Sequence, residues 1–197
     1  MTSTHESQPT MVLGDLNAIE AEDLDYNLVW LDPYKDTEYA ENVKPPRFDE
    51  HSEIEVIACH RVLDLISAET DWDLAEEVVI LTKSEKQKEV LEEDMEIPNN
   101  EEGVTVIPVC TLQEWGNEKR PVVIFSFGEC MFDEDKNELV NKEACDDGHE
   151  VLKVLDSVEG YCTRLMIVGH KEYASKLSKY WKTVADMCSE HIIETYN

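Results

Sequence analysis

Basic residues are scarce in this sequence of 197 residues. It has 17 lysines and arginines against 45 aspartates and glutamates, which gives a formal net charge of -28. Tight binding of nucleic acid depends largely on lysines and arginines that displace counterions from the phosphates. The charge therefore disfavours direct, tight nucleic-acid binding by this chain, and it favours basic protein partners.

Long apolar runs are missing as well, and the N-terminus has no leader-like segment. No run approaches the roughly 18 consecutive apolar residues of a membrane-spanning helix, and the first residues, MTSTHESQPT, are polar. The six cysteines are scattered along the chain. These features predict reduced thiols, a location in the cytoplasm or nucleus, and no membrane contact.

The short motifs of several enzyme and metal-site classes are also absent. The sequence has no GxxxxGK[ST] phosphate-binding loop and no GxSxG nucleophile elbow. Two pairs, Cys145 with His149 and Cys188 with His191, have the spacing of metal ligands, but each pair stands alone. Because a structural zinc site needs four ligands, we expect no metal.

What the chain does have is enough apolar residues, 42%, to bury a core. Residues 1–26 are polar and acidic and are predicted to form a tail, and residues 27–197 are predicted to form a single domain. In that domain, strand-like and helix-like segments alternate.

The pattern of these segments predicts the fold class. The runs VVIL, VVIF and MIV lack polar alternation, as expected for strands covered on both faces. Strands are predicted at 27–31, 77–82, 104–110, 122–127 and 164–169, and helices at 52–66, 84–95, 135–158 and 177–192. This order predicts an α/β fold with three layers around a mostly parallel sheet. Only residues 111–121 separate two of the strands, so a one-turn crossover and a hairpin both remain open.

Ligands of such a sheet bind at loops beyond the carboxyl ends of the strands. Asp32, Ser126 and Lys171 stand in such loops and loosely resemble the site of a phospho-acceptor receiver domain. The strand that should deliver the acceptor aspartate ends in Val109 and Cys110, which disfavours this interpretation.

A second set of loop residues matches a more specific pattern. Thr82 and Gln87, separated by KSEK, follow one predicted strand, and Gly116 and Glu118 lie in the loop before VVIFS, which ends at Ser126. In order and spacing these residues resemble the T-P-Y-x-x-Q and Q-G-x-E motifs and the V-V-I-x-S strand of one family. That family is the second RecA-like domain of superfamily-1 RNA and DNA helicases of the nonsense-decay and senataxin type.

The resemblance runs from about residue 50 to residue 190. Glu55 resembles the glutamate of the family's N-x-x-E-A helix start, and RLMIVGH and LSKYWKTVADMC resemble its last strand and closing helix. The resemblance implies a RecA-like sheet, with ATP bound between two such domains in an active member. The positions it implies for nucleotide or nucleic-acid contact, here vestigial, are Thr82, Gln87, Gly116, Glu118 and Ser126.

The arginines that this family places against the γ-phosphate are missing. At those positions the chain has Glu159 and Gly160, and Glu53 or His51. Two negative groups about 4 Å apart repel by about 4 kcal/mol at an effective dielectric near 20. We therefore expect no ATP hydrolysis, no catalytic residues and no cofactor.

The remaining cations near these loops offer little replacement. Arg164 should lie at the start of a strand, poorly placed to substitute. Lys119 and Arg120 are then the only cations predicted to approach a phosphate at the WGNEKR loop.

Simpler explanations exist for the matched residues. Gly116 suits a tight turn, Glu118 is one acid among many, and Thr82 with Glu85 forms a capping-box pattern. Trp115 either folds onto its own core or anchors a partner, and Trp181 is a second candidate anchor.

Three hypotheses of function follow. The preferred one is a non-catalytic, helicase-like module that binds basic or helicase-related proteins in RNA processing or RNA silencing. The second is one half of a split ATP-dependent helicase whose P-loop domain is a separate chain. The third is an unrelated α/β binding domain or enzyme.

Overall fold

The computed structural model describes residues 27–33, 52–69, 72–99, 103–116, 118, 120–128, 132–133, 138–139, 149–156 and 162–190. The predicted tail at 1–26 lies outside these ranges. So do six of the residues named above: His51, Lys119, Cys145, Glu159, Gly160 and His191.

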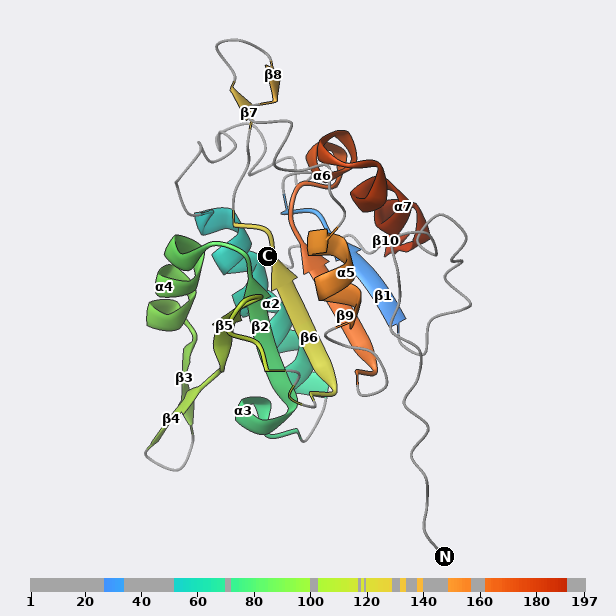
Figure 1. Ribbon diagram of the computed structural model, residues 1–197. Helices are drawn as coiled ribbons and strands as arrows, with labels where there is room; N and C mark the ends of the chain where they lie inside the picture. Colours follow the sequence, from blue (N-terminus) through green and yellow to red (C-terminus); the bar gives the residue numbers. More distant parts are fainter. Residues whose placement is uncertain are drawn as a thin grey trace, which may run out of the picture.

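Six parallel strands form the central sheet in the order β10-β1-β9-β6-β2-β5 (Figure 1). Their bounds are β1 Asn27–Leu31, β2 Val78–Thr82, β5 Val109–Thr111, β6 Val122–Ser126, β9 Arg164–Val168 and β10 Ser189–Glu190. All neighbouring strands in this sheet pair in parallel. The predicted parallel sheet is thus confirmed, and β1 and β10, from the two ends of the predicted domain, are neighbours.

Side chains of the central strands alternate between two hydrophobic clusters. Val78 and Ile80 of β2 belong to one cluster, and Val79 and Leu81 belong to the other. All five residues of β2 are buried. Because both faces are covered, both sets of positions must be apolar, which explains the runs without polar alternation.

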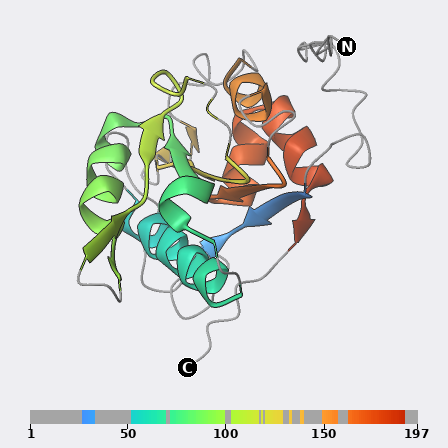
Figure 2. The same ribbon diagram turned by 90° about the horizontal axis from the view of Figure 1, so that it is seen from below.

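Helices cover both faces of the sheet and complete three layers (Figure 2). Residues of α2 (Glu53–Glu69) and α4 (Glu85–Asp94) belong to the cluster on one face, and α3 (Leu74–Glu77) contributes Leu74 to it. Residues of α5 (His149–Asp156), α6 (Lys171–Leu177) and α7 (Lys179–Met187) belong to the cluster on the other face. The predicted α/β/α layering is therefore present.

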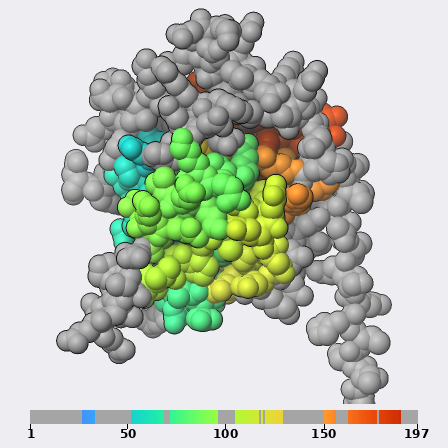
Figure 3. All heavy atoms as spheres, turned by 60° about the vertical axis from the view of Figure 1, so that its left-hand side comes forward, coloured from blue at the N-terminus to red at the C-terminus, as the bar shows by residue number. Residues whose placement is uncertain are grey.

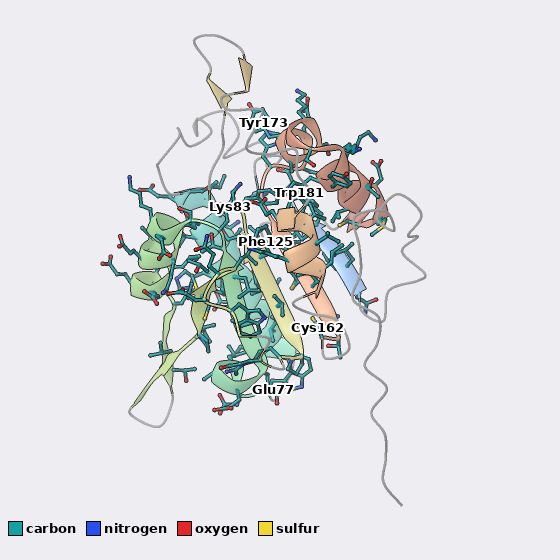
Figure 4. The ribbon with its side chains drawn as sticks, in the orientation of Figure 1. Glu77, Lys83, Phe125, Cys162, Tyr173 and Trp181 are labelled. Atoms are coloured by element: carbon teal, nitrogen blue, oxygen red, sulfur yellow. The ribbon has the colours of Figure 1, made fainter. Side chains whose placement is uncertain are left out.

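An aromatic group lies at the centre of the second cluster (Figure 4). The rings of Phe125 and Trp181 stack with centroids 5.7 Å apart, and Phe127 lies 4.6 Å from Trp181. Trp181 is 3% exposed, and its indole N–H donates to Glu150 Oε1 at 3.0 Å. Trp30 donates its own indole N–H to Gly169 O at 2.9 Å. Both buried indoles therefore have their polar atom satisfied.

The predicted strand at 104–110 is wrong, because Pro108 interrupts it. Residues Gly103–Val106 form β4, which pairs antiparallel with β3 (Glu96–Asn99), and β5 begins only at Val109. Pro108 has no backbone N–H for a ladder, and its carbonyl accepts from Ile80 N at 2.9 Å. The 111–121 connection is not a hairpin, since β2 lies between β5 and β6.

Two predicted helices are also corrected. Between 135 and 158 the described helix is only α5, and β7 (Phe132–Asp133) and β8 (Glu138–Leu139) pair antiparallel before it. The terminal helix predicted at 177–192 is shorter, because the extended Ser178 precedes α7 and caps it by accepting from Tyr180 N at 3.1 Å, and α6 before it was not predicted. The chain after Met187 enters β10.

Trp181→Ala should lower the free energy of unfolding by about 3–5 kcal/mol, because it removes a buried aromatic side chain and leaves a cavity. The adjacent Lys182 is exposed, so Lys182→Ala should change stability by no more than about 0.5 kcal/mol. Urea unfolding followed by circular dichroism measures both. Equal effects of the two substitutions would contradict the placement of Trp181 in the core.

Candidate functional site

The carboxyl ends of the central strands lie at one level. The register aligns Leu31 of β1 with Val168 of β9, Val168 with Ser126 of β6, and Ser126 with Thr82 of β2. After β2 the chain forms α4 on one face, whereas the next helix described after β6 is α5 on the other face. Loops that diverge in this way mark the topological switch points where ligands of α/β sheets bind.

Gln87 is the centre of a buried polar network at this edge. Its side chain is 0% exposed, and its Oε1 accepts from Ser52 N at 2.7 Å. Its Nε2 donates to Ser126 Oγ at 3.1 Å and to Ser52 O at 3.4 Å. The amide of Gln87 therefore joins the start of α2 to the end of β6.

Glu55 completes the network from α2. Glu55 is 2% exposed, and its Oε2 accepts from Ser126 Oγ at 2.7 Å and from Gly128 N at 2.8 Å. A buried carboxylate needs such donors because burial removes it from water. We call Ser52, Glu55, Gln87, Ser126 and Gly128 the edge network.

Gly128 is required by this packing, although no sequence motif indicated it. Its φ is 70°, a conformation that favours glycine, and an added Cβ would lie 2.6 Å from Gln87 Cβ. The sequence feature that could have indicated this role is a glycine two residues after the end of a strand, where the ligand-binding loops of such a sheet begin.

Local capping explains how α4 presents Gln87 to the edge. Ser84 is the N-cap of α4, and its Oγ accepts from Gln87 N at 3.2 Å. Thr82 is the last residue of β2 and is fully buried, and its Oγ1 accepts from Ser84 N at 3.4 Å. The predicted capping by Thr82 with Glu85 is therefore wrong, and the capping pair is Ser84 with Gln87.

Of the five positions matched by the resemblance, three come together. Gln87 and Ser126 belong to the edge network, and Thr82 adjoins it through Ser84. Gly116 is exposed, and an added Cβ would meet nothing within 4 Å. The side chain of Glu118 is 66% exposed, and its Oε2 lies 3.4 Å from Arg120 Nη2.

The two tryptophans that were candidate anchors lie against the core. Trp115 is partly buried and packs on the cluster of the α5–α7 face, which is the first of its two predicted alternatives. Trp181 is buried in the aromatic group, where it cannot contact a partner without leaving the core.

Of the two cations predicted to approach a phosphate at the carboxyl edge of the sheet, Arg120 is described, and it does not lie there. Arg120 Nη1 donates to Ala75 O at 2.7 Å, and Ala75 lies in α3, which leads into the amino end of β2. The expectation that Arg120 approaches a phosphate at the carboxyl edge is therefore wrong. Arg164 begins β9 at the same amino end, as predicted.

Two lysines that the sequence analysis did not single out follow β2 instead. Lys83 Nζ lies 3.6 Å from Glu150 Oε2 and 5.6 Å from the centroid of the Phe127 ring. Lys88 Nζ lies 2.7 Å from Glu114 Oε1. Each ammonium group thus has a carboxylate partner within the chain.

Glu114 organises the loop after β5. It accepts from Thr111 N at 2.9 Å and from Thr111 Oγ1 at 3.1 Å. The hydrogen bond from Lys88, followed by those from Thr111, lowers the pKa of Glu114 to about 2. The sequence feature that could have indicated this role is Thr111-x-x-Glu114, which has the capping-box pattern but is followed by no long helix.

Metal and membrane features are not found in the described ranges. These ranges contain no group of three or more His, Cys, Asp or Glu side chains arranged to hold a metal ion. Burial raises the pKa of Cys188 to about 12, so its thiol stays protonated. No helix within the same ranges is long and apolar enough to cross a bilayer.

Comparison with known proteins adds no assignment. No protein-family model matches the sequence, and no curated protein matches it with significant similarity.

Gln87→Leu should lower the free energy of unfolding by about 2–4 kcal/mol, because it leaves the buried Ser52 N–H and Ser126 hydroxyl without a partner. Gln113 is exposed, so the matched control Gln113→Leu should stay within about 0.5 kcal/mol of wild type. In a double-mutant cycle, Gln87→Leu and Ser126→Ala should couple by at least about 0.5 kcal/mol. Additive effects in urea unfolding would contradict the network.

Glu114 should make the stability of the fold depend on pH in acid. Its folded pKa is about 2, below the ordinary value of 4.5. The stability it contributes is therefore complete above pH 4.5 and is lost as the pH falls towards 2. Glu114→Gln should be less stable than wild type at neutral pH, and the difference should vanish at the acid end. A carboxyl of Glu114 that titrates by NMR at its ordinary value would contradict this.

Proposed function

We propose that this chain is a non-catalytic, helicase-like domain of RecA type that acts as a protein-interaction module. The resemblance supplies the class, and the convergence of Glu55, Thr82, Gln87 and Ser126 at the carboxyl edge supports it. These residues come from α2, β2, α4 and β6. By the same resemblance, we propose a place in RNA-processing or RNA-silencing assemblies.

The observation that carries the non-catalytic assignment is the self-contained bonding of the edge network. Gln87 and Ser126 are 0% exposed and bond to each other and to neighbouring backbone or carboxylate. A nucleotide would have to displace these bonds to reach either side chain. The polar groups at the switch point therefore stabilise the fold and do not face a ligand.

Phosphoryl transfer also needs cations that neutralise the developing charge. The arginines of the described chain are Arg61, Arg120 and Arg164. The last two lie at the amino end of the sheet. Arg61 lies eight residues into α2 from Glu53, about 12 Å along the helix. Lys83 and Lys88 are occupied by Glu150 and Glu114.

The charge of the molecule points to the chemistry of its partner. A formal charge of -28 repels nucleic acid and attracts basic proteins. The outer side of α4, which faces the viewer in green in Figure 3, exposes Glu85, Glu89, Glu92 and Glu93. We propose that the partner is a basic or helicase-related protein whose surface is rich in lysine and arginine.

The purified chain should hydrolyse no Mg·ATP above the blank, and Lys83→Ala should behave identically. Lys83 is the test position because it directly follows β2 at the switch point. Hydrolysis by the wild type that Lys83→Ala abolishes would contradict the non-catalytic assignment.

The partner should be captured from a nuclease-treated native lysate at low ionic strength and should then be purified for direct titration. We expect a basic protein whose affinity falls as salt rises. A partner captured only when the nuclease is omitted, or an acidic partner with no salt dependence, would contradict the proposal. ATP hydrolysis that appears only with a P-loop partner chain would identify the split-enzyme alternative.

A further inference from the structure

Helices α6 and α7 carry a basic stretch in an acidic chain. From Lys171 to Lys182 the sequence holds four of its 17 basic residues, and Glu172 is the one acid between them. The whole chain has 45 acidic residues. This local reversal of charge has no role in the edge network or in the core.

The lysines lie on the outer side of the helix pair. On α7, Trp181, Val184 and Ala185 are buried against the sheet. Lys179 and Lys182 are exposed, and their spacing of three residues places them on one face of the helix. Lys176 is exposed on α6, which packs beside α7 at the upper right of Figure 1.

Carboxylates already contact two of these lysines. Lys176 Nζ lies 2.7 Å from Glu172 Oε1, and Lys182 Nζ lies 2.7 Å from Asp186 Oδ2. Both are exposed pairs four residues apart on a helix, a class that contributes little to stability in water. A carboxylate from a partner can therefore replace either one.

The aromatic rings on these helices are half-buried and contact neighbouring side chains, which disfavours nucleic acid as the ligand. The ring of His170 lies 3.9 Å from that of Tyr173, and Lys176 Nζ lies 5.9 Å from the Tyr173 ring. Lys179 Nζ lies 4.8 Å from the Tyr180 ring. Single-stranded nucleic acid binds where bases stack on open aromatic faces, and α6 and α7 contain no arginine for bidentate phosphate contact.

The acids that α6 and α7 themselves contain are Glu172 and Asp186. At physiological ionic strength, charges separated by more than about 8 Å in solvent are largely screened. The affinity of a short ligand is then decided by the lysines that it contacts.

We propose that the outer face of α6 and α7, formed by Lys176, Lys179 and Lys182, is a docking surface for an acidic peptide segment of a partner protein. This surface is separate from the acidic surface that would meet a basic partner, and it does not depend on the proposed function.

Fluorescence anisotropy of the full chain with a labelled Glu-Ser repeat peptide tests the proposal. The wild type should bind, and the double variant K179E/K182E should bind about tenfold more weakly, which is about 1.4 kcal/mol in binding free energy. The matched control is K86E/K153E, which changes two exposed lysines of α4 and α5 and lowers the net charge by the same amount. It should leave the dissociation constant within about twofold of wild type.

Three results would overturn the proposal. The peptide could fail to bind, both double variants could weaken binding equally, or a labelled oligothymidylate could bind more tightly than the peptide at the same salt. Circular dichroism should show that both double variants are folded, as expected because all four substituted lysines are exposed.

Discussion

The arrangement of the carboxyl edge depends on the hydrogen bonds that the Glu55 carboxylate accepts. Its Oε2 accepts from the Ser126 hydroxyl and the Gly128 amide, and Ser126 accepts in turn from Gln87. These bonds fix α2 and α4 against the end of β6. Removing one member leaves the others buried without a partner, which is costlier than never burying them. Gly128 has to be glycine because the Gln87 side chain occupies the space of a Cβ.

This constraint has a direct consequence for function. The switch point of an α/β sheet usually keeps polar groups available to a ligand. Here the polar side chains at the ends of β2 and β6 stabilise the fold, and the lysines after β2 pair with Glu150 and Glu114. We therefore propose that protein partners bind at the charged outer surfaces. The acidic surface suits a basic partner, and the helix pair α6–α7 suits an acidic one.

Much of the sheet could be predicted from the sequence, because strands buried on both faces must be apolar at consecutive positions. The runs around Ile80, Ile124 and Ile167 show this, and each is a central strand. The failures have local causes: Pro108 ends a ladder, and Ser178, as the N-cap of α7, separates that helix from α6, which was not predicted.

At the site, Thr82, Gln87 and Ser126 could be placed because the ends of aligned parallel strands must meet. The role of Gly128 in the edge network and the orientation of the Arg120 side chain depend on tertiary packing, which a local sequence pattern does not determine.

The side-chain amide of Gln87 offers the most direct measurement of the central claim. In an NMR spectrum of the ¹⁵N-labelled chain, its two protons should exchange slowly with solvent, because the group is buried and bonded to Ser126 and Ser52. Addition of Mg·ATP should leave both resonances and that of the Gly128 amide unmoved. Fast exchange of the amide protons, or a saturable shift on addition of nucleotide, would contradict the account.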